Sequence, residues 1–417
     1  MSKSILSRRI STLSPSATLA VDAKVKELTG KGATILNLSL GEPDFTTPKN
    51  IQDAAIDAMH EGFTHYTQTA GIPSLRVAIA KKFKKDNGIT YDPSEIVVGV
   101  GSKQLLYHSF LALFENGDEV LVPTPTWSTY VEQLKLAGAR AVVVPLKKPF
   151  KLRAADLKSY ITKKTKGLIL NSPANPTGAI IDGEELEKIA TLAVKNNLWI
   201  ISDEIYEKIL YHPFRHPELV SGSSESKKML NQVQHDNKKI NKYVSIASLG
   251  KEIKSRTITV NGFSKAYAMT GWRIGYAGGP REVINAMINL QSQTTSNTSS
   301  IAQMAGIEAL QGDQKSIQVM AKSFAGRRAF LLKKLLGNEK IQIIAPEGAF
   351  YLFFSVQKCF NDKIRTSADW CTELLEKEQV ALVPGEAFLY PGWVRMSYAA
   401  SMEILEASVT RIKRFIG

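Results

Sequence analysis

Cysteine is scarce in this sequence, which holds only Cys359 and Cys371. Two cysteines make neither a disulfide framework nor a zinc-ligand set, and such usage is typical of a reducing compartment. No apolar run approaches the roughly 20 residues that a membrane-spanning helix requires. The first ten residues, MSKSILSRRI, include basic side chains, but no apolar stretch follows them. We therefore expect a cytoplasmic protein with no signal peptide and no membrane contact.

Nucleic-acid and metal-binding motifs are also missing. The formal net charge is +14, but the lysines lie in short groups, such as 81–85 and 147–148, without interleaved aromatic residues,. Net charge alone bears on solubility and non-specific contacts, so we expect no nucleic-acid partner. His212, His216 and His235 do not have the spacing of metal ligands, and we expect no metal site,.

The rest of the composition is that of an ordinary globular protein, with 44% hydrophobic and 22% charged residues,. A chain of 417 residues is long enough for two domains and a large core,. Short β-branched runs alternate with amphipathic segments, which indicates an α/β fold. The predicted strands are 35–40, 96–99, 119–122, 141–144, 167–170, 198–202, 257–260, 350–354, 380–383 and 394–397, and the predicted helices include 18–29, 50–61, 73–87, 183–196, 281–290, 300–311, 313–335, 367–378 and 401–416.

Lys265 is the first candidate for chemistry. Residues 257–260 are predicted to form a buried strand, and Asn261-Gly262 is predicted to be the turn that ends it,. Lys265 then lies at the carboxyl end of a strand, where open α/β sheets bind ligands. A lone lysine there is ordinarily a solvated amine. Apolar neighbours would lower its pKa and make it a nucleophile able to form a Schiff base, and these neighbours are Phe263, Ala266, Tyr267, Ala268 and Trp272,.

The segment SKAYAMTGWRIG, residues 264–275, resembles the pyridoxal-phosphate lysine motif of class I aminotransferases. The resemblance extends over nearly the whole chain and is closest to the prokaryotic subgroup of aspartate aminotransferases that also accept prephenate. It implies the type I fold of pyridoxal-phosphate-dependent transferases, with a mostly parallel central sheet flanked by helices and a smaller α+β domain. The implied division is an N-terminal arm and part of the small domain at 1–45, a large domain at 46–295 and a small domain at 296–417.

The resemblance also implies a pyridoxal 5'-phosphate site. Lys265 would hold the cofactor, while Gly101, Ser102 and Lys103 would bind its phosphate at a helix N-terminus, a natural anion site,. This turn is not a GxGxxG fingerprint, and by itself it is equally well an ordinary strand-to-helix turn. Asp203 follows a predicted buried strand, where an acid needs a cationic partner such as a protonated pyridine nitrogen.

Five further residues complete the implied cofactor contacts. Trp127 would stack on the ring, as a flat cofactor needs an aromatic face. Asn175, in NSPANPTG, and Tyr206, in DEIYE, would bond the phenolic oxygen. Arg273 would bind phosphate together with Tyr66 of a neighbouring subunit, which implies a homodimer. Without the resemblance, Trp127 is more often a core residue, and Tyr66 is interpreted equally well as a packing residue.

Substrate contacts follow from the same comparison. Gly41 in GEPDF would lie against the substrate, and Arg395 in VRMSYA would grip its α-carboxylate bidentately,. By themselves, Gly41 indicates a turn and Arg395 indicates a surface or ion-pair arginine. Trp127 and Asn175 would also contact substrate. The distal carboxylate would be bound by Lys103 with Ser16 and Thr18.

The chain departs from the family in four places. Gly262 stands three residues before the lysine, where many relatives place a phosphate-binding serine. The predicted linker 291–300 lacks the arginine that some aspartate enzymes supply from the neighbouring subunit. Ser14 replaces a lysine that is frequent in relatives using prephenate. Residues 212–242 are a polar insertion without periodic apolar positions, which predicts a disordered surface loop,.

The resemblance implies a ping-pong enzyme that transfers the amino group of L-aspartate to 2-oxoglutarate, giving oxaloacetate and L-glutamate, with prephenate as a further amino acceptor. Lys265 would act as nucleophile and proton carrier. Two alternatives stay open. One is another enzyme of the same fold, such as an aromatic or alanine aminotransferase or a carbon–sulfur lyase. The other is a non-catalytic regulator, although we expect the arm before residue 35 to be too short for a DNA-binding domain.

Overall fold

The structure is a computed structural model that describes residues 5–15, 17–211 and 243–417. Ser16 and the insertion 212–242 lie outside the described residues, and so does the side chain of Thr18. The expectations for those positions therefore stay predictions. Within the described ranges, no helix combines the length and the apolar character that a membrane crossing requires.

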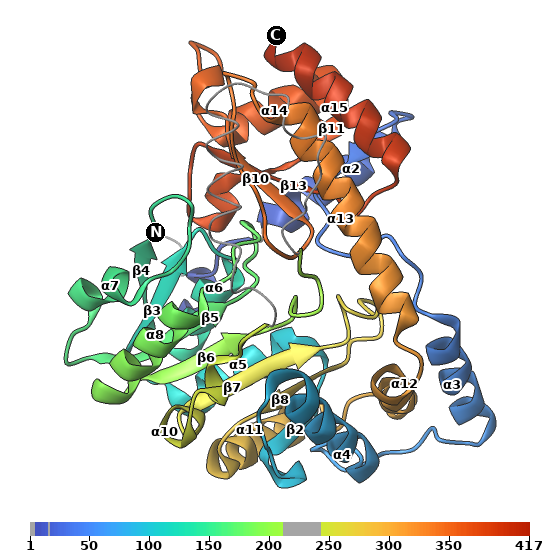
Figure 1. Cartoon of the computed structure of the whole chain (residues 1–417), viewed down its shortest axis with the longest axis vertical. Coiled ribbons are helices and arrows are strands. Elements are labelled where there is room, and N and C mark those ends of the chain that lie inside the picture. The colour runs from blue at the N-terminus through green and yellow to red at the C-terminus, as the bar shows by residue number, and fades with distance from the viewer. Residues whose placement is uncertain (1–4, 16, 212–242) are drawn as a thin grey trace.

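A seven-stranded sheet forms the centre of the larger part of the molecule (Figure 1). Its only antiparallel strand is β8, so the predicted α/β fold with a mostly parallel sheet is confirmed. In spatial order the strands are β2 (Ile96–Gly99), β8 (Gly275–Gly278), β7 (Thr257–Gly262), β6 (Trp199–Asp203), β5 (Thr165–Asn171), β3 (Glu119–Thr124) and β4 (Arg140–Pro145).

Helices cover both faces of this sheet, because successive strand residues point to opposite sides. Leu168 and Ile200 pack in one core cluster, whereas their neighbours Ile169 and Ile201 pack in another. The first cluster includes side chains of α7 (Ala154–Leu157), α8 (Gly183–Lys195) and α10 (Lys251–Lys254), and the second includes those of α5 (Gly101–Leu113), α6 (Thr129–Ala137) and α11 (Arg281–Thr294). A third cluster joins α3 (Lys49–His60), α4 (Pro73–Lys82) and α12 (Ser300–Gln311).

A smaller sheet lies above the large one in Figure 1 and is antiparallel throughout. Its order is β12 (Val383–Pro384), β13 (Trp393–Ser397), β10 (Tyr351–Ser355) and β9 (Gln342–Ile344). A separate parallel pair, β1 (Leu36–Asn37) with β11 (Val380–Ala381), attaches the N-terminal segment to this part of the chain. The surrounding helices are α2 (Ala17–Gly30), α13 (Lys315–Leu335), α14 (Ser367–Glu378) and α15 (Met402–Ile416).

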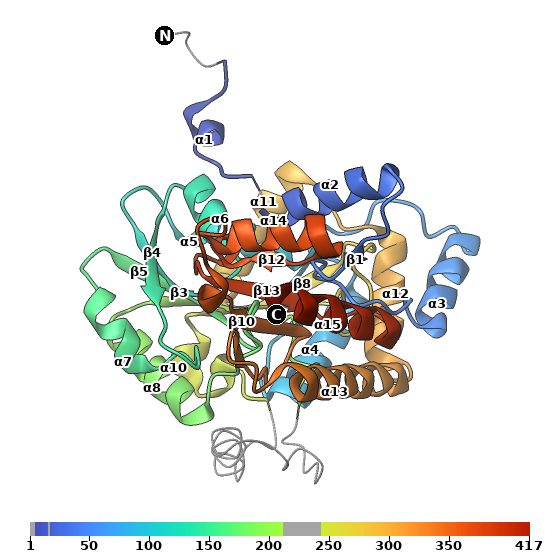
Figure 2. The ribbon, with the colours of Figure 1, turned by 90° about the horizontal axis from the view of Figure 1, so that it is seen from above.

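The N-terminal arm, which carries the short helix α1 (Arg8–Ser11), projects outward near α6 (Figure 2). The backbone N–H of Ser14 donates to the Glu132 carboxylate at 3.0 Å, which attaches the arm to α6. The predicted domain boundaries at 45 and 295 stay a prediction.

Several local predictions were wrong. Asn261 and Gly262 do not form a turn but are the last residues of β7, with Gly262 opposite Gly275 of β8. The sheet ladder and a bond from Ser102 Oγ to the Asn261 carbonyl, 2.8 Å long, outweigh the local turn preference,. The strand β8 was not predicted, because its sequence GYAG lacks β-branched residues.

The remaining corrections concern helix ends. The helix predicted at 281–290 continues to Thr294, since the buried Gln291 side chain donates to the carbonyls of Thr69 and Val98 at 2.7 and 2.8 Å. The helix predicted at 73–87 is α-helical only to Lys82 and ends in a π-helical turn, η1 (Phe83–Asn87).

Candidate active site

The predicted site residues gather at the carboxyl edge of the large sheet. Asp203 is the last residue of β6, and Lys265 follows the end of β7 by three positions. Strand β2 runs parallel to β7, because both are antiparallel to β8, so the N-terminus of α5 opens at the same edge. Arg395 reaches the region from β13 of the smaller sheet.

Lys265 is a partly buried amine held in place by one main-chain group. Its Nζ donates to the carbonyl oxygen of Gly41 at 2.5 Å. Burial, with smaller contributions from the positive charges of Arg395 and Arg273, lowers the pKa of Lys265 to about 8, although Glu42 and Asp203 oppose the shift. About a tenth of this amine is therefore neutral and nucleophilic at pH 7, far more than for an ordinary lysine.

Asp203 is buried and accepts hydrogen bonds from two neutral donors. The Tyr130 hydroxyl donates to Oδ2 at 2.7 Å, and the Ile205 N–H donates to Oδ1 at 3.3 Å. Burial raises the pKa of Asp203 to about 6. Among the described residues, no lysine or arginine forms an ion pair with this acid, so its carboxylate suits a cationic ring nitrogen,.

Arg395 is also buried, with 2% of its surface exposed, and its hydrogen-bond partners among the described residues are neutral. Nη1 donates to Asn175 Oδ1 at 3.0 Å, Nη2 donates to the Ser39 carbonyl at 2.6 Å, and Nε has no hydrogen-bond partner in the described part of the chain. The guanidinium lies between the rings of Tyr351 and Phe388, 4.5 and 4.9 Å from their centres. A buried cation without a described acidic partner is a strong site for a carboxylate, and the ion-pair interpretation of Arg395 is wrong.

Tyr206 and Gly41 meet at a residue that the sequence interpretation missed. The hydroxyl groups of Tyr206 and Tyr351 lie 2.7 Å apart. A Cβ atom on Gly41 would come within 3.1 Å of the Tyr351 hydroxyl, so the glycine permits this close approach,. Tyr351 thus links Tyr206, Gly41 and Arg395. Its sequence context, a run of buried strand residues, held no signal of that role.

Positive groups converge at the N-terminus of α5. Gly101 has φ +76°, and a Cβ there would lie 2.6 Å from Arg273 Nη2, so the guanidinium packs against bare backbone. Arg273 Nη1 donates to the Thr270 carbonyl at 2.8 Å. Lys103 Nζ stands 4.7 Å from the centre of the Trp127 ring, and burial followed by the charge of Arg273 lowers the pKa of Lys103. Two cations and a helix N-terminus form a site suited to a phosphate.

A sequence model described as "Aminotransferase class I and II" matches residues 33–412. This chain belongs to the class I and II aminotransferase family. It is 43% identical to the aspartate aminotransferase of Bacillus sp. (strain YM-2), covering 99% of this chain and 100% of that one. It is also 43% identical to a probable aspartate/prephenate aminotransferase of Aquifex aeolicus, covering 98% of each.

Solved structures of aminotransferases have the same fold. The aspartate aminotransferase of Rhizobium meliloti superposes with a TM-score of 0.89 at 37% identity, covering 99% of each chain. The Thermus thermophilus aspartate aminotransferase with maleate superposes with a TM-score of 0.88 at 38% identity, covering 99% of this chain and 100% of that one. The class I resemblance and the type I transferase fold are therefore confirmed.

The space around position 262 explains why a glycine stands there. A Cβ at position 262 would lie 2.6 Å from Ser102 Oγ and 3.2 Å from the Gly275 Cα. The Ser102 hydroxyl occupies the space that a side chain at position 262 would need. A hydroxyl is therefore present at this end of the α5 site, supplied by a different strand-to-helix turn.

Tyr66 is not brought into contact with the other predicted residues of the site. It is 90% exposed, so the interpretation of Tyr66 as a packing residue is wrong. Ser16 lies outside the described residues, and Thr18 lies in the first turn of α2 with its side chain outside them. Tyr130, one helical turn after Trp127, was missed although it stands in the same PTPTWSTY segment.

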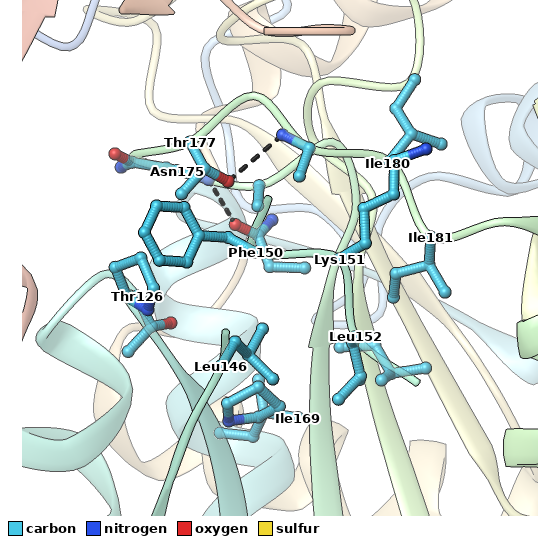
Figure 3. Close-up of a pocket in the computed structure, with 16 residues that line it drawn as sticks. Thr126, Leu146, Phe150, Lys151, Leu152, Ile169, Asn175, Thr177, Ile180 and Ile181 are labelled. Carbon is cyan, nitrogen blue, oxygen red and sulfur yellow. Dashed lines mark hydrogen bonds between the residues drawn. The ribbon is translucent and has the colours of Figure 1, made fainter. Parts of the chain in front are cut away.

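A small cavity lies behind the loop that carries Asn175 (Figure 3). Its volume is about 40 Å³, room for one or two water molecules rather than a substrate,. The Asn175 N–H donates to Asn171 Oδ1 at 2.9 Å, and the Ala179 N–H donates to Thr177 Oγ1 at 3.2 Å. These bonds hold the Asn175 loop over an apolar floor that includes Leu146, so the cavity supports the site and is not the site itself.

Proposed function

We propose that this chain is an aspartate aminotransferase, which moves the amino group of L-aspartate to 2-oxoglutarate and gives oxaloacetate and L-glutamate. The observation that carries the proposal is Arg395, a buried guanidinium with neutral partners only, on the same side of the sheet as Lys265 and Asp203. Relatives at 41 to 43% identity over the full chain are named aspartate aminotransferases.

The donors at this site fit pyridoxal 5'-phosphate, the cofactor on which the family depends. Asp203 would pair with the protonated ring nitrogen, and Tyr206 and Asn175 would bond the phenolic oxygen. Trp127 would face the ring. The phosphate would lie against Arg273 and residues 101–103, with Tyr66 of a second copy completing that contact in a homodimer; the 90% exposure of Tyr66 is compatible with this role.

When bound, the cofactor supplies an electron sink for the bonds at the substrate Cα. The residues of the chain do the rest. Lys265 Nζ, with its lowered pKa, would take and return the proton at the substrate Cα, while the Gly41 carbonyl would orient the amine. Arg395 binds the α-carboxylate with both Nη groups and thereby sets which bond at Cα faces Lys265.

The second carboxylate of aspartate would meet Lys103, with Ser16 and Thr18 as further partners. Lys103 Nζ lies 4.7 Å from the centre of the Trp127 ring, which we propose to contact the substrate. We extend the proposal to prephenate, which is named for several relatives, on the condition that Ser14 does not block it.

The first experiment measures the visible absorbance of the purified chain with pyridoxal phosphate, before and after addition of L-aspartate. We expect a bound-cofactor band that aspartate bleaches and 2-oxoglutarate restores. Lys265→Ala should give no turnover, whereas the control Lys163→Ala, at an exposed position, should behave as wild type.

A panel of amino donors separates the alternatives. If only alanine or an aromatic amino acid bleaches the band, the cofactor proposal stands and the substrate proposal fails. If cysteine-type donors release sulfide instead, the enzyme is a lyase. Absence of any cofactor band in the wild-type chain contradicts the whole proposal and favours a non-catalytic role.

A further inference from the structure

A buried polar cluster lies behind the site and takes no direct part in the chemistry proposed above. Its members are Lys82, Asn87, Glu204 and Glu207, each less than 10% exposed. Lys82 Nζ pairs with Glu207 Oε1 and donates to Asn87 Oδ1 at 2.7 Å. Asn87 Nδ2 donates to Glu207 Oε2 at 2.5 Å and to Glu204 Oε2 at 3.2 Å. Asn87 is therefore the link between the two carboxyl groups.

The cluster depends on the irregular end of helix α4. Lys82 and Asn87 are five residues apart, a spacing that an ordinary α-helix places on different faces. The π-helical turn η1 brings residues i and i+5 together, so both side chains point to the same carboxyl groups,. Such turns are frequent at functional sites.

The two glutamates of the cluster are sequence neighbours of proposed site residues. Glu204 directly follows Asp203, and Glu207 directly follows Tyr206. Successive residues at a strand end point to opposite faces, which explains why Asp203 meets Tyr130 while Glu204 faces Asn87 and the hydroxyls of Ser202 and Ser245,. Those two hydroxyls donate to Glu204 Oε1 at 2.9 and 2.6 Å.

We propose that Lys82, Asn87, Glu204 and Glu207 form a positioning cluster: by holding the two glutamates from behind, they fix Asp203 and Tyr206 against the cofactor ring. This inference rests on the proposed function, because the ring is what those two side chains would contact. An ion pair is a costly way to fill buried space, since apolar residues of the same volume usually stabilise a fold as well or better. Its value lies in fixing one geometry.

Lys82 and Glu207 form the buried ion pair of the cluster. Burial, followed by the nearby charge of Glu207, raises the pKa of Glu204 to about 8. Loss of either charge leaves the other buried without a partner, which should displace the 203–207 turn.

The test compares holoprotein variants with a matched control. The variants are Lys82→Met, Glu207→Gln, the double variant of both, and Ser245→Ala, which removes one bond to Glu204 and only mildly perturbs the fold. The control is Glu119→Gln, because Glu119 is also buried, pairs with Arg140, and lies at the amino end of β3, away from the site. The measurements are the release rate of pyridoxal phosphate, the absorbance maximum of the bound cofactor and the melting temperature.

We expect each single variant that removes a charge to release the cofactor about tenfold faster, with a shifted absorbance maximum. The size of this effect is comparable with the loss of residues that hydrogen-bond the ligands of a metal site. The double variant should recover part of that loss, because no unpaired charge remains. Ser245→Ala should give a smaller change in the same direction. Glu119→Gln should keep the wild-type release rate and absorbance even where its melting temperature falls.

The inference is wrong if the cluster variants lose only melting temperature, as the control does, and keep the wild-type release rate and absorbance. If Lys82→Met or Glu207→Gln does not fold, the result for Ser245→Ala decides. A wild-type chain that retains no pyridoxal phosphate would overturn the proposed function itself. A wild type that binds cofactor and transaminates aspartate, beside cluster variants that match the control, would overturn this inference alone.

Discussion

Two buried arginines of this protein have opposite surroundings. Arg327 forms a bidentate pair with Asp44, with Nη1–Oδ1 and Nη2–Oδ2 distances of 2.7 and 2.8 Å, beside the rings of Phe45 and Phe324. Arg395 lies between the rings of Tyr351 and Phe388 but bonds only an amide oxygen and a main-chain carbonyl. Both guanidinium groups lie near two aromatic rings, but only Arg327 has a carboxylate counter-ion among the described residues. A buried arginine that has its own acid holds the fold together, whereas one without an acid is available for a ligand carboxylate.

Replacing Arg395 should impair the use of aspartate without lowering the stability of the fold. We expect Arg395→Ala to lower kcat/KM for aspartate roughly a thousandfold, about 4 kcal/mol, because the substrate carboxylate loses a buried charged donor. Its thermal stability should stay equal to wild type or rise, since an uncompensated buried charge is removed. Steady-state kinetics and a melting curve give both numbers. A large loss of stability would mean that Arg395 serves the fold.

Replacing Arg327 should give the reverse pattern. Arg327→Ala is expected to lower the free energy of unfolding by about 3 kcal/mol, because Asp44 loses its partner in a largely buried setting. The estimate is at the low end for buried pairs, because 27% of the Asp44 side chain is exposed. Denaturant unfolding of Arg327→Ala and of the pair Arg327→Met/Asp44→Asn measures the effect. Equal stability of the wild type and the single variant would contradict the comparison.

The pKa of Lys265 should also respond differently to the loss of Arg395 and to the loss of Arg327. The charge of Arg395 lowers the pKa of Lys265, so Arg395→Ala should raise it above about 8 in the cofactor-free protein,. The sign follows because a nearby cation disfavours the protonated amine, and its removal favours it. Arg327, whose charge is matched by Asp44, is not among the groups that shift Lys265. The pH dependence of amine labelling at residue 265 should therefore move for Arg395→Ala and stay unchanged for Arg327→Ala.

The smallest effect is expected from removal of residues 212–242, which should disturb neither arginine. Buried contacts hold the chain on both sides of this segment. The Tyr398 hydroxyl donates to the Tyr211 hydroxyl at 3.1 Å, and the Tyr243 hydroxyl donates to the Ser172 carbonyl at 3.0 Å. With a short glycine-serine linker in its place, we expect kcat/KM within about twofold of wild type, because closing a flexible loop depends only weakly on its length.

A shorter linker is a control for strain across the junction. If variants with both short and longer linkers lose activity, the insertion has a role that its flanking contacts do not reveal. If only the short linker fails, the loss reflects strained closure.

The local sequence pattern predicted strands and helices correctly where tertiary packing agrees with it. The β-branched runs at β3, β5 and β6 and the amphipathic helices α8 and α15 form as predicted, because their apolar period matches the faces that they bury,. Where tertiary contacts opposed the local signal, the prediction was wrong. Asn261 and Gly262 signal a turn, yet they pair with β8 because the Ser102 hydroxyl and the ladder satisfy their backbone.

The sequence by itself determined most of the strands and helices, the family and the position of the candidate lysine, since these depend on residues close together in the chain. Only the tertiary structure decided which buried charges have partners. Arg327 and Asp44 are 283 positions apart, and Arg395 and Asn175 are 220 apart. No local pattern encodes such pairings, because the energy of a buried charge depends on its neighbours in space. The same reason hid Tyr130, Tyr351 and the cluster behind Asp203 until the chain was folded.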